Sequence, residues 1–377
     1  MKGRVLAVNT GSTSTKIGFF DGGEKLFEKN LTHSVEELSK YESVMDQDQM
    51  RLGTIMDFLS EKGIALESID IVMARGGLIT PIKTGVYWVN DDMKEALREA
   101  KEGKHACNLS ALIAADIADK VNEARAEKGL AADCGSFIAD PPMADEMLPE
   151  AKIGGLPEFP RRALFHALNS RAIGRRYARE HETDYNKVTV IVAHLGGGTS
   201  VTLHRNGEVI DTNDALGGDG PISPERAGSV PGFPLVEMCF SGKYTKAEVM
   251  KKLVGKGGAG GFFGTNDFKS VVDRAAAGDP ECKVFIDGYC LSIAKYIGAL
   301  ATDVCGKVDA ILITGGIARS EAIIADITSR VSFIAPVKVY PGEDELESLA
   351  ENGYKEIVFV GINLSDYGKN TPYSLPD

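Results

Sequence analysis

Residues 5–22 read VLAVNTGSTSTKIGFFDG, and residues 190–207 read VIVAHLGGGTSVTLHRNG. The two stretches align without a gap, so that Asn9 falls over His194. Each is an apolar strand followed by a turn of small residues, a second strand and a glycine-containing hairpin turn. This repetition predicts two related domains, each built on the same strand–turn–strand unit.

Both turns are rich in glycine, serine and threonine. Such residues leave backbone N–H groups and hydroxyls exposed with no Cβ bulk in the way, which suits the close approach of a phosphate. We therefore expect a phosphate-binding hairpin in each domain, both offered to a shared cleft. Two ordinary hairpins are the alternative, and the gapless match makes that alternative the weaker one.

Composition narrows the class of protein. The chain has 377 residues, more than one compact core usually holds, and its 43% hydrophobic and 25% charged residues are ordinary for a soluble globular protein. A net charge of −12 argues against nucleic-acid binding. We expect no transmembrane helix and no signal peptide, because no apolar run of sufficient length is present. The six scattered cysteines lack metal-site spacing, which favours free buried thiols in a reducing cytoplasm.

Patterns along the chain indicate its organisation. Helical periodicity predicts helices over residues 35–62 and 161–179, and the arginines of the second are expected on a solvated or subunit-facing surface. Residues 148–160, rich in proline and glycine, are predicted to connect the two halves. Residues 217–234 form a long irregular segment, a type that is often functional. Residues 346–377 are expected to fold back.

Three glycine-rich or lysine-bearing turns share features with known phosphate-binding motifs. Lys16 lies on the first turn, but the chain has no Walker A pattern, and a P-loop leads into a helix rather than a strand. Residues 255–260 match G-x-G-x-x-G, yet they follow a predicted helix and are interpreted as a flexible loop. Gly315 and Gly316 are better placed, because they join a buried strand to a helix whose dipole and amides face a ligand.

Two arginines stand in glycine-rich turns, Arg75 before Gly76-Gly77 and Arg226 before Ala227-Gly228. Most arginines are solvated surface charges. An arginine that leaves a buried strand directly into two glycines is harder to explain in that way. Because a guanidinium fork suits carboxylate and phosphate oxygens, both arginines are candidates for binding them.

Three histidines lie where predicted elements begin or end, His105, His166 and His194. Each alone is more often a structural histidine. His194 ends the strand of the second phosphate hairpin, which raises its standing as a functional residue.

Acidic residues also stand at such points. Asp140 ends a strand before two prolines, a position that commonly presents a carboxylate to a cleft. Asp344 and Glu345 are candidates for holding Mg²⁺, a hard cation that takes oxygen ligands, although acidic pairs are more often solvated.

Taken together, these features resemble the acetate and butyrate kinase family, which shares the fold group of actin, Hsp70 ATPase domains and sugar kinases. The resemblance covers essentially the whole chain, in the family's order. The matching elements are N-x-G-S-x-S-x-K at residues 9–16, the arginine Arg75, H-x-x-N at 105–108, the aspartate Asp140, the hinge histidine His166, H-L-G-x-G at 194–198, the second arginine Arg226, the glycines at 314–317, and the acids Asp344 and Glu345.

Several motifs depart from the acetate kinase form of that family. Asp140 is followed by two prolines, residues 166–169 read HALN, and residues 342–345 read GEDE. These departures, and the short chain, are similar to the butyrate kinase branch.

The resemblance implies an α/β fold of two duplicated actin-like (ribonuclease H-like) domains. Each would have a mixed five-stranded sheet with helices on both faces, and a cleft would lie between the domains. We expect residues 1–145 with 346–377 in the N-terminal domain, and residues 146–345 in a C-terminal domain that holds ATP.

The resemblance also implies reversible phosphoryl transfer from ATP to butyrate or a branched short-chain carboxylate, with Mg²⁺. Arg75 would hold the carboxylate, while Arg226 and His194 would stabilise the phosphoryl group. Asp140 would orient metal-bound water or Arg226, and His166 would bind phosphoryl or carboxylate oxygens. Asp344 or Glu345 would bind the metal, and Gly315 and Gly316 would lie at the adenosine. The residues implied in phosphate binding are Asn9, Ser12, Ser14, Lys16, Gly196, Gly197 and Gly198.

Three other functions remain open at this level. The nearest is an acetate or propionate kinase. A sugar kinase on the same fold would need a carboxylate base against a hydroxyl, and paired arginines would be surplus. A non-enzymatic nucleotide-switch protein would bind ATP and hydrolyse it slowly. The family's habit of subunit association implies a homo-oligomer, at least a dimer. The cysteines favour the cytoplasm, and the charge and hydropathy lead us to expect no nucleic-acid or membrane partner.

Overall fold

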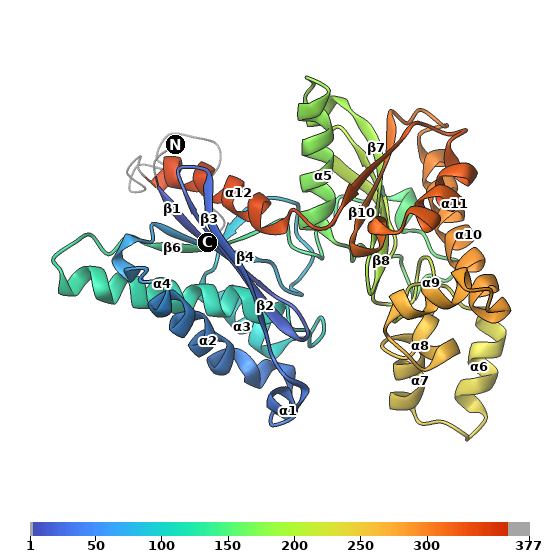
Figure 1. Ribbon diagram of the computed structural model, residues 1–377, viewed down its shortest axis with the longest axis horizontal. Coiled ribbons are helices and arrows are strands. Elements are labelled where there is room, and N and C mark those ends of the chain that lie inside the picture. Colours follow the sequence, from blue (N-terminus) through green and yellow to red (C-terminus); the bar gives the residue numbers. More distant parts are fainter. Residues whose placement is uncertain (1–2, 361–377) are drawn as a thin grey trace. The chain divides into compact units, whose positions relative to one another are not determined.

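The computed structural model describes the backbone of residues 3–360 and the side chains of residues 3–354 (Figure 1). Most of the expected returning segment 346–377 lies beyond residue 360 and so outside the described part. The chain packs as two compact units. Among the described residues, the first unit comprises 3–81, Gly85–Pro141 and 345–360, and the second comprises Ile82–Thr84 and Pro142–Asp344.

The first unit is built on a mixed sheet with strand order β3-β2-β1-β4-β6-β5. Strands β1, β4 and β6 run parallel, and the other neighbours pair antiparallel. The strands are β1 (Arg4–Thr10), β2 (Ser14–Asp21), β3 (Glu24–Thr32), β4 (Ile71–Arg75), β5 (Val86–Trp88) and β6 (Gly135–Ala139). The expectation of five strands was therefore one short here, because the three-residue β5 pairs with β6 and extends the sheet by one edge strand.

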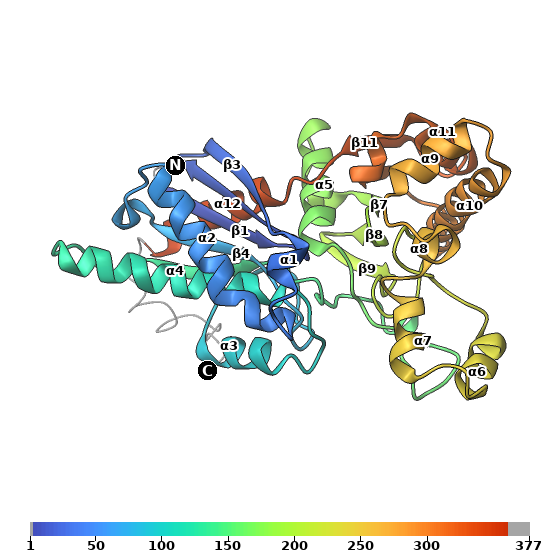
Figure 2. The same ribbon diagram turned by 60° about the horizontal axis from the view of Figure 1, so that its bottom comes forward.

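Helices cover both faces of this sheet. Helices α2 (Asp48–Glu61) and α4 (Asn108–Glu127) lie side by side on one face, and α12 (Glu345–Val360) lies on the other (Figures 1 and 2). The two shorter helices are α1 (Val35–Leu38) and α3 (Asp91–Glu99). The predicted single helix over residues 35–62 is interrupted, because Ser43 starts a new helical segment with a capping box.

The second unit repeats the same plan. Its sheet has the order β11-β10-β7-β8-β9, with β7, β10 and β11 parallel and β8 and β9 antiparallel. The strands are β7 (Thr189–Leu195), β8 (Thr199–Arg205), β9 (Glu208–Thr212), β10 (Ala310–Gly315) and β11 (Val337–Pro341). Strand for strand this is the arrangement of β1, β2, β3, β4 and β6, so the predicted duplication is confirmed.

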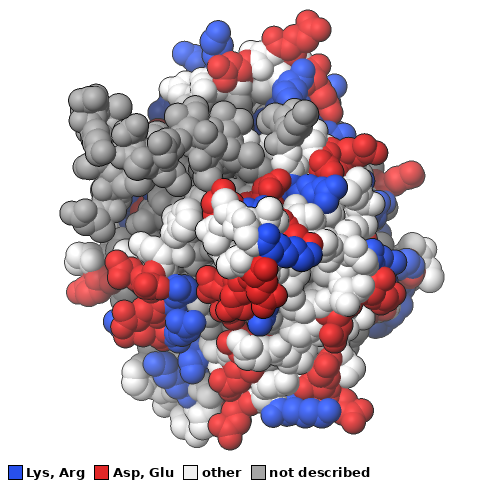
Figure 3. Space-filling model, turned by 90° about the vertical axis from the view of Figure 1, so that its left-hand side faces the viewer, with Lys and Arg blue, Asp and Glu red and all other residues white. Residues whose placement is uncertain are grey.

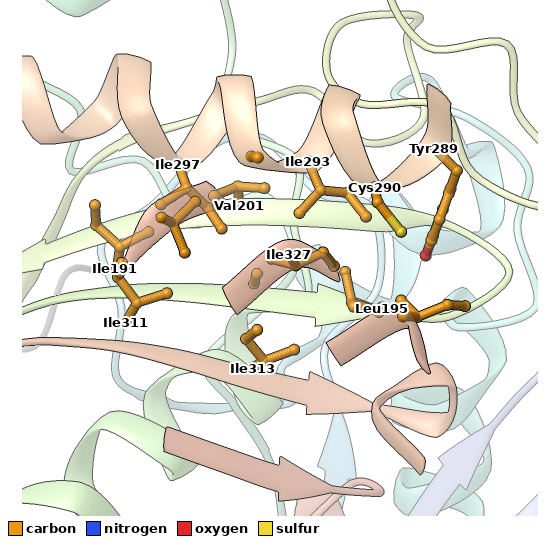
Figure 4. Close-up of a cluster of buried hydrophobic side chains, with 14 of the residues drawn as sticks. Ile191, Leu195, Val201, Tyr289, Cys290, Ile293, Ile297, Ile311, Ile313 and Ile327 are labelled. Atoms are coloured by element: carbon orange, nitrogen blue, oxygen red, sulfur yellow. The ribbon is translucent and has the colours of Figure 1, made fainter. Parts of the chain in front are cut away.

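Side-chain alternation along β7 buries both faces of this sheet. Val190 and Val192 pack toward α5 (Ala167–Glu180). Ile191 and Leu195 pack on the other face toward α10 (Pro280–Asp303), with Ile293 among their neighbours (Figure 4). Helix α11 (Glu321–Val331) joins this second cluster.

Helix α10 is long and apolar enough to cross a membrane by length and composition alone, and it is the only such helix among the described residues. That is weak evidence, because core helices pass the same test. Its side chains Tyr289, Ile293 and Ile297 are fully buried against the sheet of the second unit, which accounts for its apolar character.

The arginine-rich helix is shorter than predicted. It begins at Ala167, and Arg161 and Arg162 precede it, where they pair with Asp211 and Asp214. The expected solvated surface is also wrong for one member, because Arg171 on α5 is buried.

The remaining helices of the second unit are α6 (Gly232–Phe240), α7 (Lys246–Leu253), α8 (Gly258–Phe263) and α9 (Phe268–Ala276). The interpretation of residues 255–260 as a loop was wrong in its second half, because α8 begins at Gly258. All six cysteines are free thiols, but Cys239 and Cys305 are exposed rather than buried.

The surface reflects the acidic composition. On the face that Figure 3 shows, Asp and Glu side chains lie interspersed with Lys and Arg. This mixture accords with the net charge of −12.

Candidate functional site

Parallel pairing gathers the first group of predicted site residues. Strands β1, β4 and β6 end at the same edge of the first sheet, at or next to Asn9, Arg75 and Asp140. The hairpin turn after β1 is fastened there, because Thr10 bonds through its N–H to Ser110 (3.0 Å) and through its hydroxyl to the carbonyl of Ala106 (2.6 Å). Such an edge is where ligands bind in open α/β sheets.

Glu345 brings a buried carboxylate to this edge. It begins α12, is 3% exposed, and accepts a hydrogen bond from the side-chain amide of Asn9. Its Oε2 also lies 3.7 Å from Nη1 of Arg75. Lys16 stands opposite Asn9 in the register of β1 and β2, so the two side chains share a face.

The two glycines after Arg75 are required by close packing. A Cβ on Gly76 would lie 2.6 Å from the backbone of Pro141, and one on Gly77 would lie 2.8 Å from that of Asn108. Asn108 is fully buried and accepts a hydrogen bond from the N–H of Leu78 at 2.8 Å. The H-x-x-N element thus supports the loop that follows Arg75.

Asp140 holds an unusual backbone conformation. It is 2% exposed with φ of 41°, and its Oδ1 accepts a hydrogen bond from the N–H of Gly85 at 3.1 Å. Residues in this region of φ cluster at functional sites, where the surrounding structure holds them in place.

On the turn after β1, Ser12 is exposed and Ser14 is half-buried.

The second unit brings two predicted histidines together. The rings of His166 and His194 stack with centroids 3.8 Å apart and planes 9° apart. Nδ1 of His166 lies 2.9 Å from the hydroxyl of Ser200, which pairs with His194 across β7 and β8. Nε2 of the buried His194 lies 3.6 Å from the carboxylate of Glu343.

The glycine turn of this unit packs tightly against the segment that carries Arg226. A Cβ on Gly198 would lie 2.0 Å from Nη1 of Arg226, whose guanidinium also donates to the carbonyl of Ala215. The carbonyl of Gly197 accepts from the hydroxyl of Ser223 at 2.8 Å. A Cβ on Gly196 would lie 3.3 Å from Nε2 of His194. Bare glycines therefore allow the histidine and the arginine to approach the turn.

The Gly315-Gly316 turn follows β10 beside the end of β7. Gly315 has φ of 91°, and a Cβ there would lie 2.3 Å from the carbonyl oxygen of Leu195. Its N–H donates to the carbonyl of Gly342 at 2.9 Å. A short 3-10 turn, Gly316–Arg319, follows the glycines, and α11 begins after its N-cap Ser320, as expected from the sequence.

The two candidate metal ligands have different surroundings. Asp344 is partly exposed and pairs with Arg176 at 3.0 Å, whereas Glu345 is buried beside Asn9 and Arg75. Residues 3–360 contain no group of three or more His, Cys, Asp or Glu side chains placed to hold a metal ion by themselves. Glu345 could still bind a cation such as Mg²⁺, which takes one carboxylate from the protein and its other oxygen ligands from the substrate and water.

Sequence reasoning missed four residues of these two groups, Arg51, Ser200, Glu343 and Asn169. Arg51 carried a usable signal, because it shares the helical spacing i, i+4, i+8 with Ile55 and Leu59 and so falls on the buried face of α2. The fully buried Asn169 accepts a hydrogen bond from the hydroxyl of Thr314 at 3.3 Å, a contact across distant segments that no local pattern shows.

A buried polar network in the second unit centres on His204 of β8. His204 is fully buried, with Nδ1 2.6 Å from the hydroxyl of Tyr185 and Nε2 2.8 Å from those of Ser170 and Thr202. Burial, and secondarily the charges of Arg171 and Arg175, lower the pKa of His204 to about 3. The network therefore contains a neutral imidazole.

The chain is similar in sequence to known proteins over most of its length. The acetokinase family profile matches residues 159–352. A probable butyrate kinase of Clostridium botulinum is 45% identical over 355 residues, which cover 94% of this chain and 97% of the relative. Butyrate kinase 1 of Clostridium acetobutylicum is 47% identical over 352 residues, which cover 93% of this chain and 96% of the relative.

Solved structures support the same fold. The acetate kinase of Porphyromonas gingivalis superposes with a TM-score of 0.74 at 18% identity, covering 94% of this chain and 100% of that one. The acetate kinase of Entamoeba histolytica gives a TM-score of 0.69 at 18% identity, covering 93% and 99%. The predicted fold class is confirmed, and the sequence relatives carry the family assignment: this chain belongs to the acetokinase family.

Proposed function

We propose that this protein transfers a phosphoryl group reversibly from ATP to butyrate or a branched short-chain carboxylate, giving an acyl phosphate and ADP. The observation that carries the proposal is the 44–47% identity to proteins named butyrate kinase over 93–94% of the chain. The duplicated turns support it, because each turn has an arginine and further polar side chains near the strand ends of its own sheet.

In the first unit, Arg75 is proposed to bind the carboxylate, because a guanidinium fork matches its two oxygens. Asn9, Ser12, Ser14 and Lys16 would bind phosphate oxygens at the turn. Asp140 would orient either the metal-bound water or Arg226, as the resemblance to the family implies.

In the second unit, the turn Gly196–Gly198 is proposed to bind the phosphates of ATP. Arg226 and His194 would stabilise charge on the phosphoryl group during transfer. His166 would bind a phosphoryl or carboxylate oxygen, with its ring held by His194 and Ser200. Gly315 and Gly316 would lie at the adenosine.

The reaction forms a bond from a carboxylate oxygen to the γ-phosphorus and breaks the bond from that phosphorus to the oxygen bridging to ADP. The carboxylate attacks already ionised, so no proton has to be removed from it. Catalysis is then a matter of alignment and of compensating charge on the equatorial oxygens. The arginines suit this role because they stay protonated over the working pH range.

We propose Mg²⁺ as the accompanying cation. It would neutralise phosphate charge when bound, and it usually takes one or two carboxylates with substrate phosphates and water. The buried position of Glu345 beside Arg75 favours this residue over Asp344, which pairs with Arg176.

The protein is further proposed to be a homo-oligomer in the cytoplasm. All six cysteines are free thiols, as a reducing compartment would have them. Helix α6 exposes Phe233 (90%) and Phe240 (85%) beside a pocket of about 620 Å³ lined in part by Leu235 and Met238. Exposed apolar surface of this kind is typical of subunit contacts, and sedimentation of the Phe233→Ser variant tests it.

The function is tested by trapping acyl phosphate as hydroxamate with MgATP and a panel of acetate, propionate, butyrate, isobutyrate and valerate. A maximum at butyrate or isobutyrate is expected, and one extra methylene shifts the preference by only about 1–3 kcal/mol. A maximum at acetate would place the enzyme with the acetate kinases. Absence of turnover on every acid, with ATP still bound, would overturn the proposal.

A further inference from the structure

Arg51 is a cation held inside the first unit. It lies on α2, is 0% exposed, and ranks among the largest fully buried side chains of the described chain. Burying a charge is costly unless its donors are satisfied by well-placed acceptors. Burial lowers the pKa of Arg51, and the nearby Glu37 opposes that shift.

The donors of Arg51 converge on the first phosphate turn. Nη1 donates to the carbonyl oxygens of Gly11 (2.9 Å) and Ser14 (3.0 Å), and Nη2 donates to that of Ser12 (3.0 Å). Nη1 also reaches the hydroxyl of Thr15 at 3.2 Å, and Nη2 reaches the side-chain oxygen of Gln47 at 2.9 Å. Every one of these acceptors is an uncharged oxygen.

These bonds orient the peptide groups of the turn. The one carbonyl of Gly11–Ser14 that Arg51 does not reach, that of Thr13, accepts from the N–H of His33 at 2.9 Å. The N–H groups of Ser12 and Thr13 have no acceptor within residues 3–360, and both residues are exposed. Backbone N–H groups that point outward, with their carbonyls turned in, make an anion-binding concavity.

We propose that Arg51 is a positioning residue for anion binding at the first turn. It holds the carbonyls inward so that the N–H groups of Ser12 and Thr13 face the ligand, and it places a positive charge behind them. The inference rests on the proposed function in one respect, that the anion is a phosphate group of the substrates or products.

The second turn shows what is particular to this arrangement. There the carbonyl of Gly197 is held by the hydroxyl of Ser223 (2.8 Å) and the N–H of Glu225 (3.2 Å), which are neutral donors. Each turn thus has at least one carbonyl held by donors from another segment, and in the first turn the donor is a buried cation. Because Arg51 itself is shielded from water, its charge so close to the turn adds to the attraction for an anion there.

The test compares Arg51→Lys and Arg51→Met with matched variants at Arg125. Arg125 is also a buried arginine of the first unit that donates to backbone carbonyls, those of Glu67 (3.1 Å) and Ile69 (2.9 Å), but these precede β4 at the opposite end of that strand from Arg75. Arg125 also pairs with Asp70 and Asp133, so its variants report the loss of a buried, well-bonded arginine without touching the turn.

Two readouts are made on the full chain, the rise in Tm caused by inorganic phosphate and the KM values for MgATP and butyrate. Arg51→Met is expected to lose the phosphate-induced rise in Tm and to raise the KM for MgATP by about 10- to 100-fold, as small displacements of binding groups do. Arg51→Lys, which keeps the charge but not the fork, should fall between wild type and Arg51→Met. The Arg125 variants should lower Tm and leave both readouts unchanged.

Equal behaviour of the Arg51 and Arg125 variants would overturn the inference, and so would a wild-type protein that phosphate does not stabilise. If the methionine variants fail to fold, the comparison of Arg51→Lys with Arg125→Lys decides. If the wild type makes no acyl phosphate, the proposed function fails, while the phosphate-induced rise in Tm still tests the role of Arg51.

Discussion

His166 and His194 stack face to face, with ring centroids 3.8 Å apart and planes inclined by 9°. The two residues are separated by α5 in the chain, and the start of that helix and the end of β7 meet at this stack. Ser200 completes the arrangement, because its hydroxyl lies 2.9 Å from Nδ1 of His166. The neighbouring ring and this hydroxyl together restrict how the His166 imidazole can turn.

Replacing Ser200 by alanine should lower kcat by about 5- to 10-fold, the equivalent of one hydrogen bond of about 1 kcal/mol. The loss should appear in kcat rather than in either KM if His166 acts chiefly in the transition state. Steady-state kinetics with butyrate and MgATP measure it.

Thr202→Val is the matched control for Ser200→Ala. Thr202 lies two residues further along β8, on the same face, and its hydroxyl bonds Ser170 and His204 rather than His166. It should lower Tm and leave kcat near the wild-type value. Unchanged kcat in Ser200→Ala would show that the hydroxyl does not position His166.

Adding a single methyl group at Gly198 should displace Arg226, because the new Cβ would lie 2.0 Å from Nη1 of that arginine. We expect Gly198→Ala to lower kcat/KM by about 100-fold, as a displacement of about 1 Å in a catalytic group does. The charge of the site is unchanged, so the effect isolates position.

Gly288→Ala controls for the substitution itself. Gly288 lies in α10 of the same unit, and an added Cβ there meets nothing within 4 Å. It should stabilise the helix by about 0.5–1 kcal/mol and leave kcat/KM unchanged. Wild-type activity in Gly198→Ala would show that catalysis does not depend on the present position of Arg226.

Arg75→Lys should raise the KM for butyrate by about 10-fold or more and leave the KM for MgATP within about two-fold, because lysine cannot form the paired hydrogen bonds of a guanidinium fork. Initial rates at varied butyrate and saturating MgATP measure the change. Arg98→Lys, at an exposed position on α3, is the matched control and should behave as wild type. An equal rise in both KM values would assign Arg75 to the nucleotide instead.

Much of the fold could be predicted because it is encoded locally. The apolar runs of β1 and β7 and the small residues after them are visible in the sequence, and their repetition predicted the duplication. The edge strand β5 was missed because three residues give too short an alternation to stand out. The start of α5 was placed too early because the arginines before it bind Asp211 and Asp214, which are distant in the chain.

The candidate site likewise contains residues that local sequence patterns mark and residues that only tertiary contacts reveal. Arg75, Asp140, His166 and His194 lie at the ends or starts of elements, and the sequence marks three of these positions with a glycine or proline one or two residues later, at Arg75, Asp140 and His194. Glu343 and Ser200 gain their significance only from tertiary contacts with the histidines, so no local pattern could single them out.

His204 should make the stability of the folded chain depend on pH. Burial keeps its imidazole neutral in the folded chain, with the pKa lowered to about 3 from an ordinary value of 6.5. The unfolded chain takes up a proton as pH falls below about 6.5, while the folded chain takes it up only near pH 3. Between these values the unfolded state binds more protons, so this histidine lowers stability by about 1.4 kcal/mol for each unit of falling pH.

His204→Asn removes the titrating group and leaves the carboxylates in place. Asp303, whose pKa is raised to about 6 chiefly by burial, acts in the opposite direction, and it is present in both proteins, so it cancels in the comparison. The wild type should be the more stable protein at pH 7, and its advantage in Tm should shrink steadily as pH falls from 6.5 to 4. Thermal unfolding of both proteins across that range measures the difference. Parallel Tm curves would contradict a neutral, buried His204, because only a proton taken up on unfolding makes the two curves converge.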